Sequence, residues 1–525
     1  MSTSGDSGGF RQRLGLFDCS MLIAGTMIGS GIFIVSSEMA RDVGSTGWLL
    51  VVWLVSGLMT ILGALSYAEL AAMMPQAGGQ YIFLRESYSP LFGFLYGWTS
   101  FTVIQTGTIA AVAVAFAKFL GVLFPELGVG DGAKVLYQVK DFHYVIKLPL
   151  PWLAESLTVF DRTDFTIKAG HVVAVLVILA LTVWNTRGVE QGKWLQNIFT
   201  VAKIGSLVVL ILVGVLVTFN SDIASKNFAD LWSGIFGTKQ FAEVARSVQG
   251  QGVAPPNHGG IATLLAWMVI GGALVGALFS SDAWNNVTFS AAEVHNPRRN
   301  LPLSLLIGTG LVTVLYLLAN CAYLVSLPLN GTKDGATVLS RGIAYAADER
   351  VATAMMEQAW PGRGHFVMAV AIMISTFGCI NGLILMGARL YYAMARDNLF
   401  FGAVGKLNRN GVPGSGLWFQ AAWACLLVFS GTYGDLLDYV IFAALLFYAM
   451  TVAGLFVLRY TRPAMERPYR AIGYPILPGL YVILCTVVML DLLIVKPKFT
   501  WPGLILVLAG IPVYFLWKGF RSAKS

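Results

Sequence analysis

Residues 25–33 read Gly25-Thr26-Met27-Ile28-Gly29-Ser30-Gly31-Ile32-Phe33 and interrupt the first hydrophobic segment, which extends from about Leu16 to Ser37. That segment is long enough to span a lipid bilayer. Its three glycines disfavour a continuous helix, because each costs roughly 1 kcal/mol relative to alanine. Backbone groups released from a helix inside a membrane need other partners, so a break persists only where protein or a cavity surrounds it. A broken span near the bilayer midplane indicates a transporter's substrate site.

The composition is that of a polytopic membrane protein. Hydrophobic residues make up 56% of the 525 residues and charged residues only 12%, whereas soluble domains have about 45–50% and 25%. The net charge of +8 comes largely from basic residues in short loops, so it indicates membrane orientation rather than nucleic-acid binding. Residues 1–14 are polar and lack the features of a cleavable signal peptide, so they predict a cytoplasmic tail before an uncleaved first span.

Hydropathy predicts an all-α integral membrane protein with about twelve transmembrane helices. The predicted spans are 15–38, 47–74, 90–124, 167–185, 195–219, 261–291, 301–327, 364–393, 415–431, 436–459, 475–495 and 500–518. An even number of spans returns the C-terminal tail, residues 519–525, to the cytoplasm. The loops that this topology places inside carry most of the basic residues, as the positive-inside rule requires. We expect a multi-pass protein of the plasma membrane or the inner cell membrane.

Three long loops, at 125–166, 220–260 and 328–363, are predicted on the outer side, where they could form a cap. Residues 134–147 alternate enough in character to suggest a short β-hairpin. Irregular covering loops are the alternative.

A second interrupted span supports a repeat. It reads Gly271-Gly272-Ala273-Leu274-Val275-Gly276-Ala277-Leu278-Phe279-Ser280-Ser281-Asp282-Ala283-Trp284-Asn285-Asn286. Spans one and six are corresponding members of two five-helix units, at 15–219 and 261–459, and an odd number of spans inverts the second unit relative to the first. Paired broken helices in inverted repeats are typical of transporters. Helices eleven and twelve, within 460–518, fall outside the repeat.

The first break offers backbone groups to a ligand. The N-terminus of its second half-helix would suit a carboxylate, and free carbonyls would suit an ammonium group, so the pair matches a zwitterionic amino acid. The candidate residues are Thr26, Met27, Ile28, Gly29, Ser30 and Gly31, with Ser30 able to add its hydroxyl. The alternative is that these small residues only allow close helix packing.

The second break supplies the other half of the candidate site. Carbonyls around Phe279, Ser280 and Ser281 could accept hydrogen bonds from the substrate ammonium, with Phe279 either a cover over the ligand or a packing residue. Trp284 could form a wall of the side-chain pocket, and Asn285 belongs to the same candidate set. A carboxylate within a span is costly unless it is paired or hydrated. Asp282 is therefore either a charge partner for the substrate or a group that faces a polar vestibule without a role.

Lys203 lies within the fifth span, one to two turns from its inner end. It could extend to the cytoplasm along the helix surface. The alternative, which we favour, is a fixed ammonium on the carbonyls of the broken first helix, where it would occupy the place of a sodium ion. Ser375 and Thr376 in the eighth span could add hydroxyls near that position. Glu69 and Glu293, near inner helix ends, could pair with inner-loop arginines such as Arg85 or Arg298.

Four motifs resemble the amino acid–polyamine–organocation superfamily, and within it the L-type amino acid transporters and their bacterial relatives. They are Gly25–Phe33, Ser66-Tyr67-Ala68-Glu69-Leu70 with Pro75-Gln76-Ala77-Gly78-Gly79-Gln80-Tyr81, Glu293-Val294-His295-Asn296-Pro297-Arg298-Arg299-Asn300-Leu301-Pro302, and Ala388-Arg389-Leu390-Tyr391-Tyr392-Ala393-Met394-Ala395-Arg396-Asp397. The resemblance implies twelve helices with a LeuT-like five-plus-five inverted repeat, discontinuous helices one and six, and transport by alternating access.

The resemblance also implies that Lys203 matches a helix-five lysine of sodium-independent members. Animal members pair with a single-span glycoprotein through a cysteine after helix three; loop 125–166 has no cysteine, so no disulfide-linked partner is expected. Asp282 stands where L-type members have a small neutral residue, which leaves side-chain selectivity open.

We therefore predict a secondary transporter of L-amino acids, neutral ones favoured, that works by exchange or proton symport. A cationic amino acid or polyamine antiporter is the alternative suggested by Asp282, and a non-transporting amino acid sensor is a third possibility. An intramembrane enzyme would need clustered His, Asp or Glu, but the five histidines are scattered. No Walker-type loop and no metal-ligand spacing is present in the sequence, so neither a cofactor nor a metal is expected.

Overall fold

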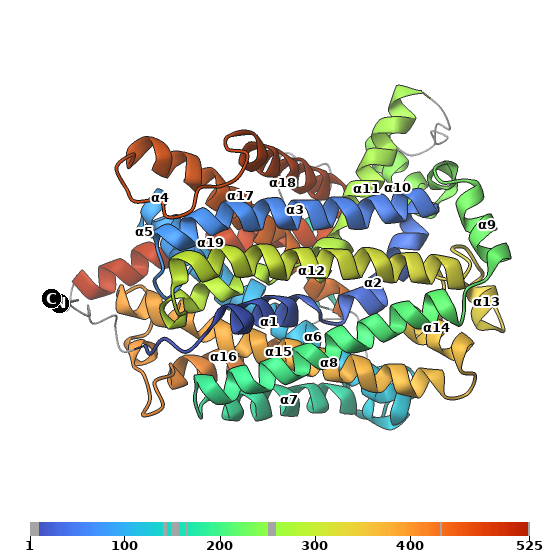
Figure 1. Ribbon diagram of the computed structural model, residues 1–525, viewed down its shortest axis with the longest axis horizontal. Helices are drawn as coiled ribbons and strands as arrows, with labels where there is room; N and C mark the ends of the chain where they lie inside the picture. Colours follow the sequence, from blue (N-terminus) through green and yellow to red (C-terminus); the bar gives the residue numbers. More distant parts are fainter. Residues whose placement is uncertain are drawn as a thin grey trace.

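The computed structural model describes residues 10–139, 144–148, 157–162, 165–249, 259–430 and 433–522, and most of them are helical (Figure 1). The helices of the bundle are α1 (Leu16–Met27), α2 (Gly31–Val43), α3 (Thr46–Met73), α5 (Pro90–Thr99), η1 (Ser100–Ile104), α6 (Gln105–Leu123), α7 (Ala169–Asn185), α8 (Val189–Leu216), α11 (Gly260–Ser280), η4 (Trp284–Glu293), α12 (Pro297–Ser326), α15 (Gly364–Arg396), α16 (Gly414–Leu427), α17 (Tyr433–Thr461), α18 (Ile476–Val495) and α19 (Pro497–Ser522).

Each of the twelve predicted spans coincides with a helical segment of the described chain. Among the described residues, nine helices are long and apolar enough to cross a membrane, and the bent pair α1 and α2 makes a tenth. The remaining two, α7 and α16, have 17 and 14 residues and are shorter than the usual span. The protein is therefore a helical membrane protein whose first and sixth spans are discontinuous.

The bundle has two distinct ends. The described chain begins before α1 and ends with α19 at the same end of the bundle, at the left of Figure 1. That end also holds α4 (Gln80–Ser87), η6 (Gly402–Gly405) and residues 462–475, and we call it the basic end. The capped end, opposite, holds the short helices η2 (Pro125–Leu127), α9 (Ser221–Ala229), η3 (Ser233–Gly237), α10 (Lys239–Gln249), α13 (Val338–Arg341), η5 (Ala347–Glu349) and α14 (Val351–Ala359).

The long loops therefore contain secondary structure where the structure describes them. Parts of loops 125–166 and 220–260, and the terminal tails 1–9 and 523–525, lie outside the described residues.

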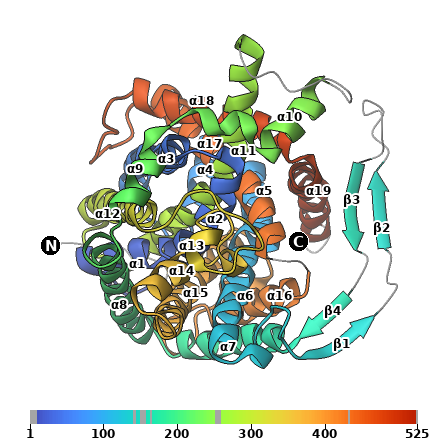
Figure 2. The same ribbon diagram turned by 90° about the vertical axis from the view of Figure 1, so that its right-hand side faces the viewer.

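Four short strands lie beside the helices (Figure 2). They are β1 (Val135–Val139), β2 (Tyr144–Leu148), β3 (Leu157–Arg162) and β4 (Phe165–Lys168). β1 pairs antiparallel with β4, and β2 pairs antiparallel with β3. The prediction of strand structure in 134–147 is confirmed, but the hairpin pairing within it is wrong. The intervening sequence Lys140-Asp141-Phe142-His143 has no glycine or asparagine for the tight turns that hairpins prefer.

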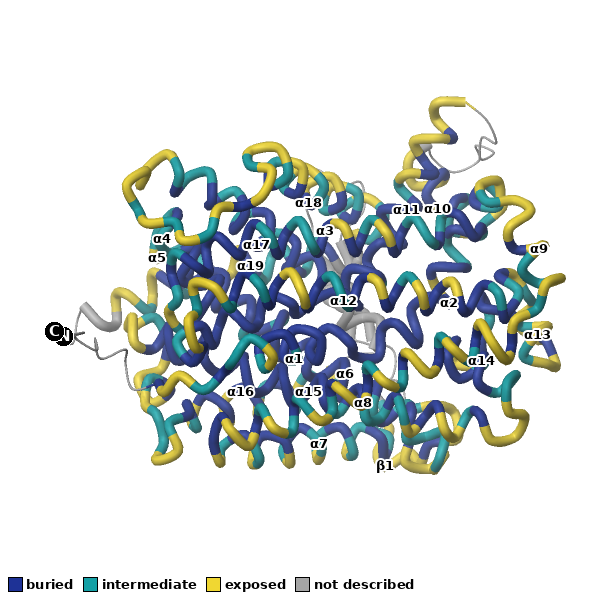
Figure 3. The backbone as a smooth tube through the Cα atoms, in the orientation of Figure 1, coloured by how far each residue is buried: buried dark blue, intermediate teal, exposed yellow. Residues whose placement is uncertain are grey.

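The two discontinuous spans form the centre of the bundle. Every residue from Leu22 to Ser37 is buried, and so is every residue from Ala277 to Ala291. Figure 3 shows the buried segments running through the middle of the molecule, with exposed residues on the outer helices. α7, α8, α18 and α19 present exposed apolar faces, as helices in contact with lipid do. Both breaks are therefore enclosed by protein on all sides.

Candidate substrate site at the two helix breaks

The first break separates α1 from α2, whose axes are bent by 41°. The α1 hydrogen-bond ladder ends with Ile28 N donating to Ala24 O at 2.9 Å, and α2 begins at Gly31. A side chain at Gly31 is impossible without movement, because a Cβ there would lie 2.1 Å from Ser280 Oγ and 3.0 Å from Ser280 Cα. This glycine therefore allows the start of α2 to touch the end of α11.

Lys203 reaches the carbonyl side of the first break. It is fully buried, and its Nζ donates to Gly25 O at 2.7 Å and to Ile28 O at 2.9 Å. Ser375 on α15 adds its hydroxyl, 3.1 Å from Ile28 O and 3.2 Å from Gly29 O. Thr376 does not reach the break, since its hydroxyl donates to Ile372 O and Met373 O of its own helix. Lys203 thus points to the break and not along the helix to solvent.

Two further side chains complete the carbonyl side, and neither was a candidate from the sequence. Cys379 Sγ lies 3.0 Å from Thr26 O, and the Tyr316 hydroxyl lies 2.9 Å from Met27 O. Every carbonyl from residue 25 to residue 29 therefore has a side-chain donor from α8, α12 or α15. No sequence signal distinguishes Tyr316 or Cys379 from residues that only pack, because both lie in long apolar spans.

The second break lies between α11 and η4. Ala283 has a left-handed backbone conformation with φ +64°, and η4 begins at Trp284. The two breaks are linked directly, because the Tyr316 hydroxyl also lies 3.0 Å from Ser280 O and the Thr26 hydroxyl lies 3.2 Å from Ala283 O. The structure therefore brings both candidate segments into one site.

Asp282 is the only carboxylate at the described breaks. It is buried, with 6% of its surface exposed, and the Tyr448 hydroxyl of α17 donates to it at 2.5 Å. None of the ion pairs of the described residues involves Asp282. Tyr448 also lies 3.1 Å from Asn285 Oδ1, and Asn285 Nδ2 donates to Gln80 Oε1 at 2.8 Å. Asp282 is thus a buried acid whose partner is a hydroxyl rather than a cation.

Small cavities adjoin Asp282 and Tyr448 on two sides. One has a volume of about 10 Å³ and is lined by polar groups that include Gln105 and Asn286. The other, of about 20 Å³, is lined by Thr60, Ser281 and Trp284. A single water molecule needs a cavity volume of roughly 10–15 Å³, so neither cavity is large enough for an amino acid in this closed conformation.

Aromatic rings surround the same acid. Trp284 packs edge-on against Tyr67, with ring centroids 4.8 Å apart, and lies 5.3 Å from the Tyr448 ring. Phe279 is 7% exposed at the end of α11, and Ser281 Oγ lies 3.3 Å from Ser56 Oγ. The predicted residues of span six therefore lie around one buried carboxylate.

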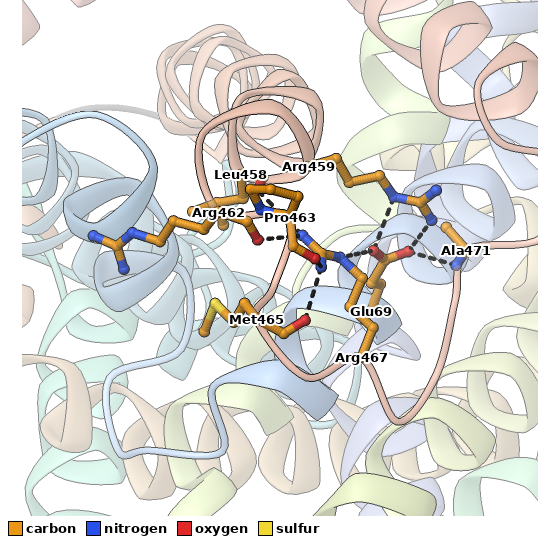
Figure 4. A network of polar contacts seen from close by, with 8 residues as sticks. All are labelled: Glu69, Leu458, Arg459, Arg462, Pro463, Met465, Arg467 and Ala471. Atoms are coloured by element: carbon orange, nitrogen blue, oxygen red, sulfur yellow. Dashed lines mark hydrogen bonds and ion pairs between the residues drawn. The ribbon is translucent and has the colours of Figure 1, made fainter.

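The basic end is closed below the site by buried ion pairs. Glu69 is fully buried and forms a bidentate pair with Arg459, at 3.0 and 2.6 Å, while it also accepts from Ala471 N at 2.7 Å (Figure 4). Arg467 approaches the same carboxylate at 3.3 Å. Glu293 pairs with Arg389 at 3.1 Å, and both are buried. Glu69 therefore pairs with arginines of a predicted inner loop, as expected, but the two examples named from the sequence, Arg85 and Arg298, are wrong. Glu293 pairs with Arg389 inside α15 and not with an inner-loop arginine.

The expected partners have other roles at the basic end. Arg85 pairs with Asp397, which also accepts from the Tyr81 hydroxyl at 2.7 Å, and Arg298 pairs with Glu466. Partial burial acts to raise the pKa of Glu86, but hydrogen bonds from Arg462 and Arg85 outweigh it and hold that pKa below its ordinary value. These contacts join α4 to α15 and to the end of α17.

A cavity of about 850 Å³ opens on the capped side of the breaks. It is lined by Ile34 and Val35 of α2, one turn beyond the first break, and by Lys118 of α6. Arg41 crosses its wall, donating to Glu349 at 2.8 Å and to Ala344 O at 2.7 Å. The site is therefore more tightly sealed toward the basic end than toward the capped end.

No group of three or more His, Cys, Asp or Glu that could hold a metal ion occurs within the described residues.

Comparison with known proteins agrees with this geometry. The family model described as "Amino acid permease" matches residues 14–516. The chain is 27% identical to the human b(0,+)-type amino acid transporter 1 over 515 residues, which cover 97% of this chain and 89% of the relative. It is 28% identical to the rat protein of the same name over 528 residues, or 99% and 91% of the two chains.

Similarity extends to a second kind of transporter. The chain is 27% identical to the rabbit large neutral amino acids transporter small subunit 2 over 521 residues, which cover 98% of this chain and 82% of the relative. These relatives are transporters and not enzymes. The match over almost the whole length shows that the chain belongs to the amino acid permease family.

Proposed function

We propose that the protein is a secondary transporter that moves L-amino acids, with neutral ones favoured, through the site between the two helix breaks. The observation that supports this most strongly is the contrast, at the first break, between the backbone carbonyls of residues 25–29 and the N-terminus of α2. Its carbonyls have donors from the protein itself, whereas α2 begins at Gly31 with the partial positive charge of a helix N-terminus, which favours a carboxylate.

The substrate ammonium would then lie toward the second break. With the carbonyls of residues 25–29 occupied, the carbonyls around Ser281 and the Asp282 carboxylate remain as acceptors at the second break, where Ser280 packs directly against Gly31 of α2. This assignment keeps Phe279, Ser280, Ser281, Asp282, Trp284 and Asn285 as substrate-binding candidates, together with residues 26–31. The side chain of the substrate would extend toward Tyr448 and the small cavities beside it.

A cationic substrate is the second candidate, and Asp282 favours it. A buried carboxylate without a cationic partner is costly, and a guanidinium or ammonium on the substrate side chain would provide that partner. If the substrate is a neutral amino acid, the Tyr448 hydroxyl and the substrate ammonium must together be enough to stabilise the buried Asp282 carboxylate. Competition for uptake by leucine, alanine, arginine and agmatine separates the two candidates.

Sodium independence follows from the position of Lys203. Its ammonium binds the Gly25 and Ile28 carbonyls, which are oxygen ligands of the kind that a hard cation prefers. A fixed positive charge at these carbonyls leaves no favourable place for a sodium ion. Exchange or proton symport would then drive transport.

Alternating access fits the unequal closure of the two ends. We infer that the basic end faces the cytoplasm, in keeping with the positive-inside rule, so Glu69, Arg459 and Arg389 would close the inward path. The two five-helix units, 15–219 and 261–459, would move around the breaks as inverted repeats, with helices α18 and α19 at the periphery. No disulfide-linked partner is proposed, since the chain has no cysteine between Cys19 and Cys321, although one relative is named a small subunit.

The test is uptake of radiolabelled amino acids into proteoliposomes, with and without sodium, a proton gradient and internal amino acid. We expect uptake that internal amino acid or a proton gradient stimulates and that sodium does not change. Binding without counterflow would favour a sensor and contradict transport. Inhibition by arginine and agmatine, with none by neutral amino acids, would replace the first candidate with the second.

A further inference from the structure

A separate cavity of about 490 Å³ lies at the basic end, away from the helix breaks. Four segments form it: the residues before α1, the turn between α7 and α8 with the start of α8, the end of η4, and residues 407–411. Its charged lining residues are Arg11, Arg13, Arg187, Glu190, Glu293 and Arg409. The proposed transport site does not use this cavity.

The lining carries an excess of positive charge. Its four arginines face two carboxylates, and both carboxylates already have partners: Glu190 pairs with Arg13, and Glu293 pairs with Arg389 behind the wall. Arg11, Arg187 and Arg409 form no ion pair with any carboxylate of the described chain. Three guanidinium groups at one cavity favour an anion with several oxygens, because each can donate two parallel hydrogen bonds to it.

A helix N-terminus adds to this preference. α8 begins at Val189 and runs for 28 residues, and its first residues line the cavity together with Gly188. Gly188 has φ +141° and caps the helix without a side chain, so no side-chain oxygen of its own covers the first N–H groups of α8. Such an N-terminus carries partial positive charge, which favours a phosphate, and the acid of its first turn, Glu190, is paired with Arg13.

The wall opposite α8 is held in place by specific hydrogen bonds. Asn408 Nδ2 and Asn410 Nδ2 both donate to Thr186 O, at 2.9 and 3.1 Å. Asn408 Oδ1 accepts from Asn410 N at 2.9 Å and from Val412 N at 3.1 Å. The turn that carries Arg409 is therefore anchored to the turn that carries Arg187.

The surroundings favour a lipid over a soluble anion. The same two helices present exposed apolar side chains next to the cavity: Trp194 is 63% exposed and Val183 is 41% exposed. The Arg187 guanidinium lies over the Trp184 ring, 5.3 Å from its centroid. Tryptophan side chains near the ends of transmembrane helices are typical of the membrane interface, and basic pockets between helices at that interface bind anionic lipid headgroups.

We propose that this cavity binds the phosphate headgroup of an anionic phospholipid, with Arg11, Arg187 and Arg409 as the charged ligands and the acyl chains on the outer face of α7 and α8. The bound lipid would steady the closed basic end. Arg13 N and Leu14 N both donate to Glu293 O, at 2.7 and 2.9 Å, and His295 N donates to Leu14 O at 2.8 Å. The wall of the cavity thus joins the start of α1 to the end of η4, the two elements that carry the breaks.

The test is native mass spectrometry of the purified full-length protein, titrated with phosphatidylglycerol or with phosphatidylcholine of the same chain length. The pocket variant combines Arg187→Gln with Arg409→Gln. The control combines Arg299→Gln with Arg396→Gln, which removes the same charge from exposed positions elsewhere at the basic end. We expect phosphatidylglycerol to bind roughly thirtyfold more weakly to the pocket variant, the combined effect of two arginines near an anionic headgroup, and to bind normally to the control.

A second variant, Arg187→Lys with Arg409→Lys, guards against misfolding, because it keeps the charge and should retain most of the phosphatidylglycerol binding. Equal loss in the pocket and control variants, no loss in either, or equal binding of phosphatidylcholine would overturn the proposal. Inorganic phosphate is the remaining arm of the experiment. If millimolar phosphate displaces phosphatidylglycerol and raises the melting temperature as much, the ligand is a soluble anion and the lipid proposal fails.

Discussion

Both helix breaks are visible in the sequence, but they differ in what surrounds them. At the first break, Lys203, Tyr316, Ser375 and Cys379 provide a donor for every carbonyl from residue 25 to residue 29. At the second, a hydroxyl from Tyr448 donates to Asp282, and small cavities lie on two sides of it. The protein thus satisfies the carbonyls of the first break, whereas the second retains a buried acid that forms no ion pair within the described residues, with space beside it.

Under the proposed function, this difference divides substrate recognition into two parts. The first break, whose carbonyls have donors from the protein, would bind the α-carboxylate that all amino acids share. The second break, with a buried acid and small cavities, would bind the ammonium and distinguish the side chains that vary. We therefore expect substitutions at the first break to affect all substrates alike, and substitutions at the second to change their order of preference.

The largest effect is expected from Gly31→Ala. A methyl group there would lie 2.1 Å from Ser280 Oγ, so the two breaks must separate, and uptake in proteoliposomes should fall at least about 100-fold, a loss of roughly 3 kcal/mol in the transition state. Gly205→Ala is the control, because a Cβ at Gly205 meets no atom within 4 Å. Wild-type uptake by Gly31→Ala would show that the contact between the breaks is dispensable.

Lys203→Met should have the next largest effect. It leaves the Gly25 and Ile28 carbonyls without the lysine donor, at a cost of about 1–3 kcal/mol for each carbonyl that stays unsatisfied. We expect a lower melting temperature and at least a tenfold loss of uptake for every substrate, with sodium restoring part of the uptake only in this variant. Lys226→Met makes the same change at an exposed position. If the two variants behave alike, the first break does not depend on a fixed cation.

Asp282→Asn should change selectivity more than rate. The amide keeps a hydrogen-bond acceptor for Tyr448 but removes the buried charge. Inhibition by arginine should weaken about tenfold, or 1.4 kcal/mol, while leucine uptake should fall by only about two- to fivefold, roughly 0.5–1 kcal/mol, because the carbonyls around Ser281 still accept from the substrate ammonium. Competition assays measure both in one experiment. Equal loss of neutral and cationic substrates would contradict the division between a common and a variable half-site.

Tyr448→Phe is expected to have the smallest effect, a change of about two- to fivefold in apparent affinity, which is the net value of one hydrogen bond. The double variant with Asp282→Asn should show a coupling of about 0.5–3 kcal/mol, as residues in contact do. Tyr460→Phe is the control, since Tyr460 is 89% exposed. If the effects of the two substitutions on apparent affinity simply add, the Tyr448 hydroxyl does not act through Asp282.

Features that depend on local sequence could be predicted. The glycines at 25, 29 and 31 and the polar run after Phe279 revealed both breaks, and hydropathy located every helix of the bundle, because both signals arise within one segment. The partners of the breaks could not be found in this way. Tyr316 and Cys379 lie in apolar spans hundreds of residues from Met27 and Thr26, and nothing in their own neighbourhoods differs from ordinary packing residues.

The same limit explains the errors at the basic end and in the strands. The positive-inside pattern predicts an inner-loop arginine as the partner of Glu69, but it does not identify which one. The pair forms with Arg459, about 390 positions away, and not with Arg85 or Arg298. The strand β1 reaches past β2 and β3 to pair with β4, because pairing depends on how the chain folds back and not on the alternation within one stretch.

The Tyr316 hydroxyl has a consequence for how the two half-helices communicate. It is within hydrogen-bond distance of Met27 O on one break and Ser280 O on the other, yet a hydroxyl carries only one proton to donate. Donation to one carbonyl leaves the other to find a different donor, so the two acceptors compete for a shared proton. Under the proposed function, a ligand ammonium that bound one of these carbonyls would release the proton to the other, so binding on one side would be transmitted across the site by the rotation of a single O–H bond.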